Sequence, residues 1–528
     1  MSLARNTLVQ ASLTLGSRIL GFARDLALAA QFGQGPLMDA WATALMAPNL
    51  FRRLFAEGAF AQAFVPIYGR VKAEEGDAAA ADAASRALSF LLLVVVVFVI
   101  LAQVAMPLIM PLLLSAYRDQ PEILELATRA TQLAMPYLAC MALASLLSGV
   151  LNTSGRFALS AGVPALLNVC TLAPLLLIDD PELGLLATSA AVTGAGLLQA
   201  GILWWGVRKL GVRLRVGLPR LSPVVRRILT LAIPGALAGG ATQMNSLVSQ
   251  VLTGSDPGAR SVLYNADRLY QLPLGLVGVA IGLALVPRLT RSFVSGDEAG
   301  ARSTLDDGIA LAMAFTLPAA VALFVIPYFL IDATVTRGAF TSEDAARTAN
   351  VLRHFAWGVP AFVLAKVFTP PFFARQDMRR PMNFAVITVV ANIVLGAGLY
   401  FGLGRVGVDG VVGLAIATSI SAWLNVVLLA GTLAREGMYR PGPEIVSRLL
   451  RIVAASTVMG AVLWLFAVNY DSLAGLLWSK ELAIVAACLA GFGVYGVAVF
   501  AFRAVSPAEL RAALRREPGA AAPASGLE

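Results

Sequence analysis

Residues 17–66 read SRILGFARDLALAAQFGQGPLMDAWATALMAPNLFRRLFAEGAFAQAFVP. This stretch is apolar enough to lie in a bilayer, yet it contains four arginines and three carboxylates: Arg18, Arg24, Arg52, Arg53, Asp25, Asp39 and Glu57. A charged side chain at mid-bilayer depth costs about 2.5–3.5 kcal/mol on insertion scales, so it is kept where it faces protein or a wet cavity. Since guanidinium groups bind anionic oxygens, the stretch predicts an arginine-lined cavity for an anion.

The composition of the whole chain indicates a helical membrane protein. Of its 528 residues, 58% are hydrophobic and only 13% are charged, whereas soluble domains have about 25% charged residues. The apolar run 88–114 exceeds the roughly 20 residues that cross a bilayer. A β-barrel would show short alternating segments instead. We therefore predict an all-α, polytopic membrane protein.

Hydrophobic periodicity predicts about fourteen transmembrane helices with short loops between them. They span residues 9–32, 38–68, 87–114, 123–152, 159–178, 184–207, 225–251, 262–287, 305–330, 348–374, 381–402, 410–433, 448–468 and 480–502. Several contain proline, which membrane helices tolerate as bending points. No large soluble domain fits between these segments.

The basic residues of the loops predict the orientation. On the side shared by the two termini the loops carry 25 Lys and Arg, against six on the other side: Arg118, Arg260, Arg337, Arg347, Arg405 and Lys480. Cytoplasmic loops are the ones enriched in Lys and Arg. We therefore expect both termini in the cytoplasm. The net charge of +9 is accounted for by these loops and does not indicate a nucleic-acid partner.

An internal repeat divides the chain. Residues 64–88 (FVPIYGRVKAEEGDAAAADAASRAL) and 285–309 (LVPRLTRSFVSGDEAGARSTLDDGI) share a pattern at an offset of 221 residues. The offset spans six helices, so the copies have the same orientation and predict two pseudo-symmetric six-helix lobes with a substrate path between them. We predict an N-lobe at 1–215, a C-lobe at 216–440, two additional helices at 441–505 and a flexible cytoplasmic tail at 506–528.

The embedded charges define the candidate site. Arg53 and Glu57 are four residues apart, so they either form a local ion pair or belong to the site. Arg52 points about 100° away from Arg53. The candidate substrate-binding residues are Arg18, Arg24, Arg52 and Arg268, together with Asp39, Glu57, Asp25 and Arg53. Arg268 lies in the second repeat, and a set split between two lobes suits a ligand held between them.

The sequence offers no catalytic constellation. Cys140, Cys170 and Cys488 fall within apolar segments, where free cysteine is a small buried hydrophobe. No P-loop, nucleophile arrangement or metal-ligand spacing is present. We therefore expect neither an enzyme nor a cofactor nor a bound metal.

Several segments carry a family resemblance that covers residues 5–505. The chain resembles the MurJ (MviN) lipid II flippases of the MOP exporter superfamily in SRILGFARD (17–25), DAWATALMAPNLFRRLFAEGAFAQAFVP (39–66), DRLYQLPLGLVGVAIGLALVPRL (267–289), NTSGRF (152–157) and ARQD (374–377). The resemblance implies a MATE-like fold that moves the undecaprenyl-diphosphate-linked peptidoglycan precursor between leaflets of the bacterial inner membrane. Membrane lipids and other cell-wall synthesis proteins are the further partners that it implies.

The resemblance also implies roles for particular residues. In the family, the arginines that match Arg18, Arg24, Arg52 and Arg268 line the central cavity, matches to Asp39 and Glu57 are implicated in function, and the last two helices guide the lipid tail. Some members bind sodium. Asn392 and Thr418 match two of those ligands, but Gly396 stands one turn beyond Asn392 and helix 381–402 has no carboxylate. We expect alternating access driven by the membrane potential.

Three other classes of function compete with this interpretation. A cation-coupled multidrug exporter of the same superfamily would need an acidic cavity. A flippase for another polyprenyl-diphosphate-linked saccharide would carry basic residues, but not this set of segments. A membrane-embedded enzyme acting on polyprenyl phosphates would need a catalytic cluster on the cytoplasmic loops, which are short and basic.

Overall fold

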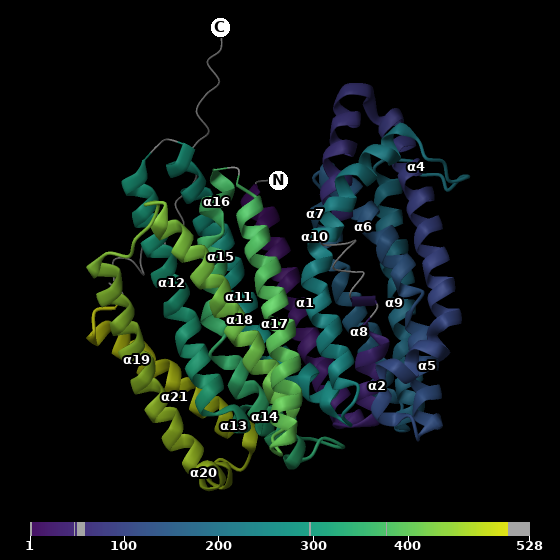
Figure 1. Cartoon of the computed structure of the whole chain (residues 1–528). Coiled ribbons are helices and arrows are strands. Elements are labelled where there is room, and N and C mark those ends of the chain that lie inside the picture. Colours follow the sequence, from purple (N-terminus) through teal and green to yellow (C-terminus); the bar gives the residue numbers. More distant parts are fainter. Residues whose placement is uncertain (1–2, 47, 50–58, 295–296, 376, 505–528) are drawn as a thin grey trace. The chain divides into compact units, whose positions relative to one another are not determined.

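The computed structural model describes residues 3–46, 48–49, 59–294, 297–375 and 377–504 and is helical throughout, with no strand in those ranges (Figure 1). This confirms the predicted all-α class. Ten of the described helical segments are long and apolar enough to cross a membrane. Every predicted span overlaps one or more helices, and residues 47 and 50–58 of the predicted span 38–68 lie outside the described residues. The total of fourteen membrane crossings stays a prediction.

The helices of the first half follow the predicted segments, with extra breaks. They are α1 (Leu3–Phe32), α2 (Pro36–Ala44), α4 (Ala59–Leu113), the short 3-10 helix η1 (Ser115–Tyr117), α5 (Pro121–Ala134), α6 (Tyr137–Thr153), α7 (Phe157–Gly162), α8 (Pro164–Leu177), α9 (Pro181–Lys209) and α10 (Pro223–Thr253). The predicted helix 123–152 is divided at Pro136, and 159–178 is divided before Pro164. Proline lacks the N–H that would continue the ladder.

The second half contains α11 (Ala259–Val294), α12 (Glu298–Val325), α13 (Pro327–Thr334), α14 (Ser342–Ala356), α15 (Val359–Phe368), α16 (Pro370–Ala374), α17 (Arg379–Arg405), α18 (Gly410–Arg435), α19 (Pro443–Val468), α20 (Tyr470–Leu476) and α21 (Lys480–Ala501). The predicted helix 348–374 is divided into α14, α15 and α16. Prolines stand at the start of α15 and of α16, where a missing N–H costs nothing.

One expected loop is helical. The charged stretch 74–82, expected as a soluble-looking connection between two membrane helices, lies inside α4. The direction of α4 changes at Gly76, which has a φ of 88°. Glycine adopts this left-handed conformation without the steric cost that a Cβ imposes. The connection therefore consists of two helical segments that meet at a kink at Gly76.

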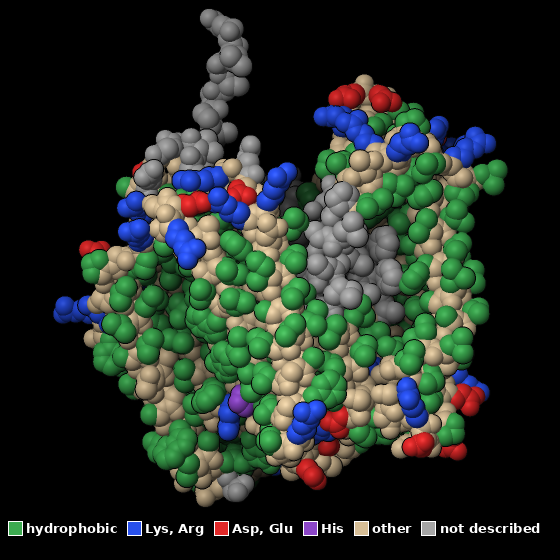
Figure 2. All heavy atoms as spheres, in the orientation of Figure 1, with side chains coloured by type: hydrophobic (Ala, Val, Ile, Leu, Met, Phe, Trp, Pro, Cys, Tyr) green, Lys and Arg blue, Asp and Glu red, His purple; other side chains and the backbone are tan. Residues whose placement is uncertain are grey.

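Backbone packing groups the chain into two compact units. Unit 1 comprises residues 1–268, 334–351 and 382–421. In it α9 packs against α5, α6 and α8, and α1 packs against α8. Around α4 and α5, at the right of Figure 2, apolar side chains cover the length of the helices and charged ones gather at both ends, as expected of helices in lipid.

Unit 2 comprises residues 269–333, 352–381 and 422–528. Its α19 packs against both α12 and α21. The hydroxyl of Tyr495 on α21 donates to the carbonyl of Ala314 on α12 at 2.6 Å, and an apolar cluster that includes Phe329 and Leu463 fills the space between α13, α19 and α21. The two units do not test the repeat-based boundaries at 215 and 440, which stay predictions.

Two glycines on α9 provide a matched test of this packing. A Cβ at Gly196 would lie 2.6 Å from Tyr137 Cδ2 and 2.8 Å from Cys140 Cβ, whereas one at Gly194 would meet nothing within 4 Å. We expect Gly196→Ala to lower the free energy of unfolding by about 1–3 kcal/mol through overpacking. Gly194→Ala should raise it by about 0.4–1 kcal/mol. Thermal unfolding in detergent measures both, and equal shifts would contradict the close contact of α9 with α6.

Candidate functional site

Arg24 on α1 is buried and is held from two sides. Its Nη1 donates to Asn168 Oδ1 on α8 at 3.0 Å. Its Nε and Nη2 donate to Asp25 Oδ1 at 3.1 and 2.7 Å. Asn168 is itself fixed, because its Nδ2 donates to the carbonyl of Ser17 at 2.8 Å. The guanidinium group of Arg24 is therefore positioned by the packing of α8 on α1.

Arg268 on α11 meets the same carboxylate. Its Nε lies 3.6 Å from Asp25 Oδ2. Tyr264, one turn earlier on α11, donates its hydroxyl to Asp25 Oδ1 at 3.1 Å. The Arg268 Cζ lies 4.7 Å from the centre of the Tyr264 ring, a cation–π contact, and its Nη2 donates to the Tyr264 hydroxyl at 3.3 Å. Asp25 thus joins two arginines that are 244 residues apart in sequence.

A small cavity lies beside these arginines. Its volume is about 30 Å³, and its described lining is Arg24, Trp41, Leu45, Pro48, Asn49, Tyr137, Leu167, Thr171, Val192 and Arg268. A cavity of this size holds water and excludes a sugar or a diphosphate. The side chain of Arg268 is nevertheless 36% exposed. Part of this side chain is therefore accessible although the cavity itself is small.

The other predicted site residues divide into two groups. Arg18 lies on α1, less than two turns before Arg24, and its side chain is exposed. Arg52, Arg53 and Glu57 lie outside the described residues. The structure therefore brings together Arg24, Asp25 and Arg268 from the predicted set.

Asp39 lies apart from this cluster in a network of its own. It is on α2, is 1% exposed, and accepts three hydrogen bonds of 2.8 Å from within unit 1. The donors are the Tyr117 hydroxyl on η1 and the backbone N–H groups of Gly258 and Ser261. Burial and the nearby Asp39 carboxylate raise the pKa of the Tyr117 phenol, so Tyr117 stays protonated and donates. Asp39 joins α2 to the start of α11.

A second buried arginine, Arg260, strengthens this join. It is 1% exposed and donates to the Thr43 hydroxyl on α2 and to the Gln250 carbonyl, and at 2.7 Å to the Leu113 carbonyl. The turn at 254–258 comes so close to α4 that a Cβ at Gly254 would lie 1.9 Å from the Leu113 oxygen. Arg260 was assigned to a loop by the sequence, and the structure corrects this to the first turn of α11.

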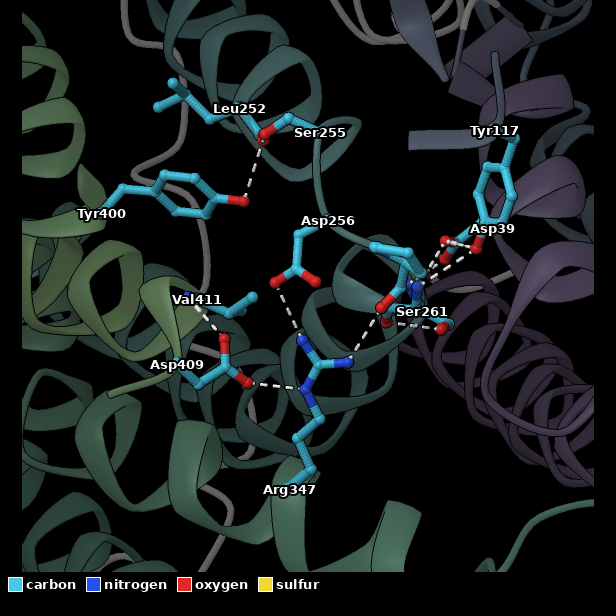
Figure 3. Close-up of polar contacts among 12 residues, drawn as sticks. Asp39, Tyr117, Leu252, Ser255, Asp256, Ser261, Arg347, Tyr400, Asp409 and Val411 are labelled. Atoms are coloured by element: carbon cyan, nitrogen blue, oxygen red, sulfur yellow. Dashed lines mark hydrogen bonds and ion pairs between the residues drawn. The ribbon is translucent and has the colours of Figure 1, made fainter. Parts of the chain in front are cut away.

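The same turn is held on its other side by Arg347 of α14 (Figure 3). Its Nε donates to Asp409 Oδ2 at 2.6 Å and its Nη2 to Asp256 Oδ2 at 3.0 Å. Its Nη1 donates to the carbonyl of Pro257 at 3.0 Å. Asp409 also accepts from the N–H of Val411 at 2.9 Å, at the start of α18. The 254–258 turn is therefore tied to α2, η1, α14 and α18 through buried or half-buried charges.

No cluster of three or more His, Cys, Asp or Glu that suits a metal occurs in the part of the chain that the structure describes. What the arrangement offers chemically is charge-assisted hydrogen bonding from two arginines, Arg24 and Arg268.

The family of the chain follows from comparison with known proteins. A model of the family "Lipid II flippase MurJ" matches residues 28–478. The chain belongs to the MurJ family.

Individual MurJ proteins match along nearly the whole chain. A probable lipid II flippase MurJ of Rhizobium tropici is 36% identical over 529 residues, which cover 98% of this chain and 97% of that protein. A lipid II flippase MurJ of Burkholderia cenocepacia is 31% identical over 512 residues, covering 93% and 96%.

Solved structures share the fold. A lipid II flippase MurJ in an inward closed conformation aligns with a TM-score of 0.77 at 24% identity, over 94% of this chain and 99% of that one. An inward-facing MATE multidrug transporter of the MOP superfamily aligns with a TM-score of 0.64 at 13% identity, over 81% and 98%. These confirm the predicted MATE-like class.

For this MurJ family member, sequence reasoning missed the groups that position the arginines. Tyr264 stands four residues before Arg268, the spacing of neighbours on one helix face, and Asn168 is an isolated amide in an apolar helix. The spacing of Tyr264 and the isolated amide of Asn168 could therefore have predicted both contacts from the sequence. Arg347 gave no such signal, because its partners Asp256 and Asp409 are distant in sequence.

The two carboxylates that hold Arg347 are expected to differ in their effect on stability. Partial burial raises the pKa of Asp256, although Arg347 opposes this shift. A carboxyl group with a raised folded-state pKa stabilises most at low pH, and this contribution is lost as pH rises through that pKa. At pH 7, Asp256→Ala should therefore change the melting temperature little. Asp409→Ala should cost about 1–3 kcal/mol, because it removes the 2.6 Å bond and the acceptor for Val411.

Thermal unfolding in detergent at pH 7 and pH 5 checks both variants. The deficit of Asp256→Ala relative to the unmodified chain should grow on acidification. A deficit that shrinks at pH 5, or an Asp256→Ala variant less stable than Asp409→Ala at pH 7, would contradict these roles.

Proposed function

We propose that this chain translocates lipid II, the undecaprenyl-diphosphate-linked peptidoglycan precursor, from the cytoplasmic to the periplasmic leaflet. The observation that carries the proposal is the convergence of Arg24 and Arg268 on Asp25, in a chain of the MurJ family. Guanidinium groups bind phosphate oxygens in a bidentate manner. A lipid diphosphate is an anion that two arginines bind by hydrogen bonds and charge, and its binding requires no covalent step.

The diphosphate takes over contacts that the protein now makes with itself. Asp25 forms ion pairs with both arginines, and each guanidinium group has five N–H donors. The accessible part of Arg268 makes the first contact, and Arg24 follows as the cavity widens. Arg18 and Arg52, predicted from the sequence, extend the basic lining along the sugar and peptide head. Arg53 and Glu57 are proposed to belong to the same wall.

Alternating access moves the bound head group across the membrane. The lobes at 1–215 and 216–440 open to one side and then to the other. The Asp39 network closes the predicted periplasmic side, because it fastens α2 to the start of α11, and it opens when the head group leaves. Asp39 acts on the substrate through this closure.

The helices at 441–505 are proposed to guide the undecaprenyl tail. α19 and α21 expose large apolar side chains, among them Trp464, Leu489 and Phe492. Lys480 at the start of α21 is paired with the buried Asp332 on α13 at 2.7 Å, which fixes this helix pair within unit 2. The protein is proposed to lie in the inner membrane with both termini cytoplasmic and with other cell-wall synthesis proteins as partners.

Substitution of the paired arginines tests the site. In a bacterium depleted of its own lipid II flippase, we expect Arg24→Ala and Arg268→Ala to abolish rescue of growth, because each removes a donor to the diphosphate. Arg129→Ala should rescue fully, since Arg129 is exposed and pairs with Glu125 on the surface of α5. Protein levels in the membrane serve as the control. Growth with normal wall synthesis in Arg24→Ala or Arg268→Ala would overturn the assignment.

The membrane potential is the proposed driving force. Moving two negative charges outward across an inside-negative membrane is downhill by about 4.6 kcal/mol per 100 mV, twice the single-charge value. In proteoliposomes, the rate and extent of lipid II translocation should therefore rise with an imposed inside-negative potential. A rate that is the same at zero and at 100 mV would contradict this driving force.

A further inference from the structure

The linker between α9 and α10 carries basic side chains that the proposed transport does not use. Residues 212–222 are neither helix nor strand and lie beside α4. The backbone N–H groups of Arg215 and Gly217 donate to the hydroxyls of Ser85 and Ser89 on α4, both at 3.0 Å. These bonds fix the linker to α4.

Side chains alternate along this linker. Val212 and Leu214 are buried, while Arg213 and Arg215 are exposed. The linker therefore presents a row of arginines outward. Figure 2 shows Lys and Arg side chains gathered at this end of unit 1, where α4 bends.

The first turns of α10 continue the same two-sided pattern. Val225 and Ile228 are buried, whereas Arg226 and Arg227 are exposed. One turn further along, Leu231 is 55% exposed. A helical turn rises 5.4 Å, so a basic layer lies directly beside an apolar one, as phosphate groups lie beside acyl chains in a membrane.

A cavity lies where these layers meet. Its volume is about 630 Å³, and its described lining is Leu221, Pro223, Arg226, Arg227, Thr230 and Leu231. Arg226, Arg227 and Thr230 are its polar lining residues, and its apolar ones include two leucines that are more than half exposed. This size and composition suit one phosphate with the first carbons of an attached chain.

The arginines of this cavity differ in pairing from two arginines on α4. Within the described ranges, no carboxylate pairs with Arg226 or Arg227. On the adjoining part of α4, Arg86 is paired with Asp82 at 2.7 Å and Arg70 with Glu74 at 3.6 Å. The first turn of α10 also has no acidic residue, so its positive macrodipole adds to the two charges. Both contributions favour an anion from outside the protein.

Aromatic residues place this cavity at the level of lipid head groups. At the end of α9, where the linker begins, Lys209 Nζ lies 3.9 Å from the centre of the Trp205 ring, and Arg208 Cζ lies 5.9 Å from that of Trp204. Tryptophan concentrates at the membrane interface, with basic residues on the cytoplasmic side.

We propose that the cavity lined by Leu221, Arg226, Arg227 and Leu231 binds the phosphate head group of an anionic phospholipid from the surrounding membrane. The arginines hold the phosphate, and an acyl chain lies along the two leucines. The lipid must carry a net negative charge, because a zwitterionic head group would place its own cationic group beside the arginines. This site is independent of the transport of lipid II.

Native mass spectrometry of the full chain in detergent, titrated with phosphatidylglycerol, tests the proposal. We expect Arg226→Gln combined with Arg227→Gln to weaken phosphatidylglycerol binding about tenfold or more. Arg226→Lys with Arg227→Lys should keep most of the affinity, because it keeps the charge. The matched control is Arg70→Gln with Arg86→Gln, which changes two exposed arginines that already have carboxylate partners and should leave the affinity unchanged.

Three results would overturn the proposal. They are an unchanged affinity in the double Gln variant of α10, binding of phosphatidylcholine as tight as that of phosphatidylglycerol, and displacement of phosphatidylglycerol by millimolar inorganic phosphate. The last result would reveal a site for the bare anion without the lipid. Melting temperatures of all variants confirm that the chain remains folded.

Discussion

The carboxylate of Asp25 is the contact on which the basic site depends. It accepts hydrogen bonds from Arg24 and from the Tyr264 hydroxyl and forms an ion pair with Arg268, and it thereby joins α1 to α11. Without such a group, two guanidinium charges would face each other in a medium where each one is costly. The same carboxylate holds both arginines at one point of the structure. In the proposed transport, the substrate diphosphate competes with this carboxylate for the two guanidinium groups.

The start of α11 connects this site to the Asp39 network. Ser261, whose N–H binds Asp39, lies seven residues before Arg268, about 10 Å along the helix and on the same face. Tyr264 lies between them and contacts Asp25. The two carboxylates Asp25 and Asp39 thus hold one rigid segment. In the transport proposed above, movement of this segment away from α2 would therefore change the contacts of Arg268 in the same step.

The sequence predicted the helical class and the positions of the membrane segments because long apolar runs leave little choice of structure in a bilayer. It also singled out Arg24, Asp25, Arg268 and Asp39, since a buried charge stands out against such a background. It placed Asp39 with the arginines, whereas the structure fastens Asp39 to Gly258 and Ser261. Every residue except proline has a backbone N–H group, so the sequence does not show which of them will bind Asp39. Arg260 and Arg347 were counted as loop bases for the same reason: their partners are defined by the fold.

The central claim is that this chain carries lipid II across the membrane. The most direct measurement is the accessibility of lipid II to a probe that acts only on the outer leaflet, in cells where this protein is depleted. The account predicts that lipid II accumulates inside and becomes inaccessible to the probe, and that the unmodified chain restores access. Undiminished access to the probe in fully depleted cells would contradict the claim.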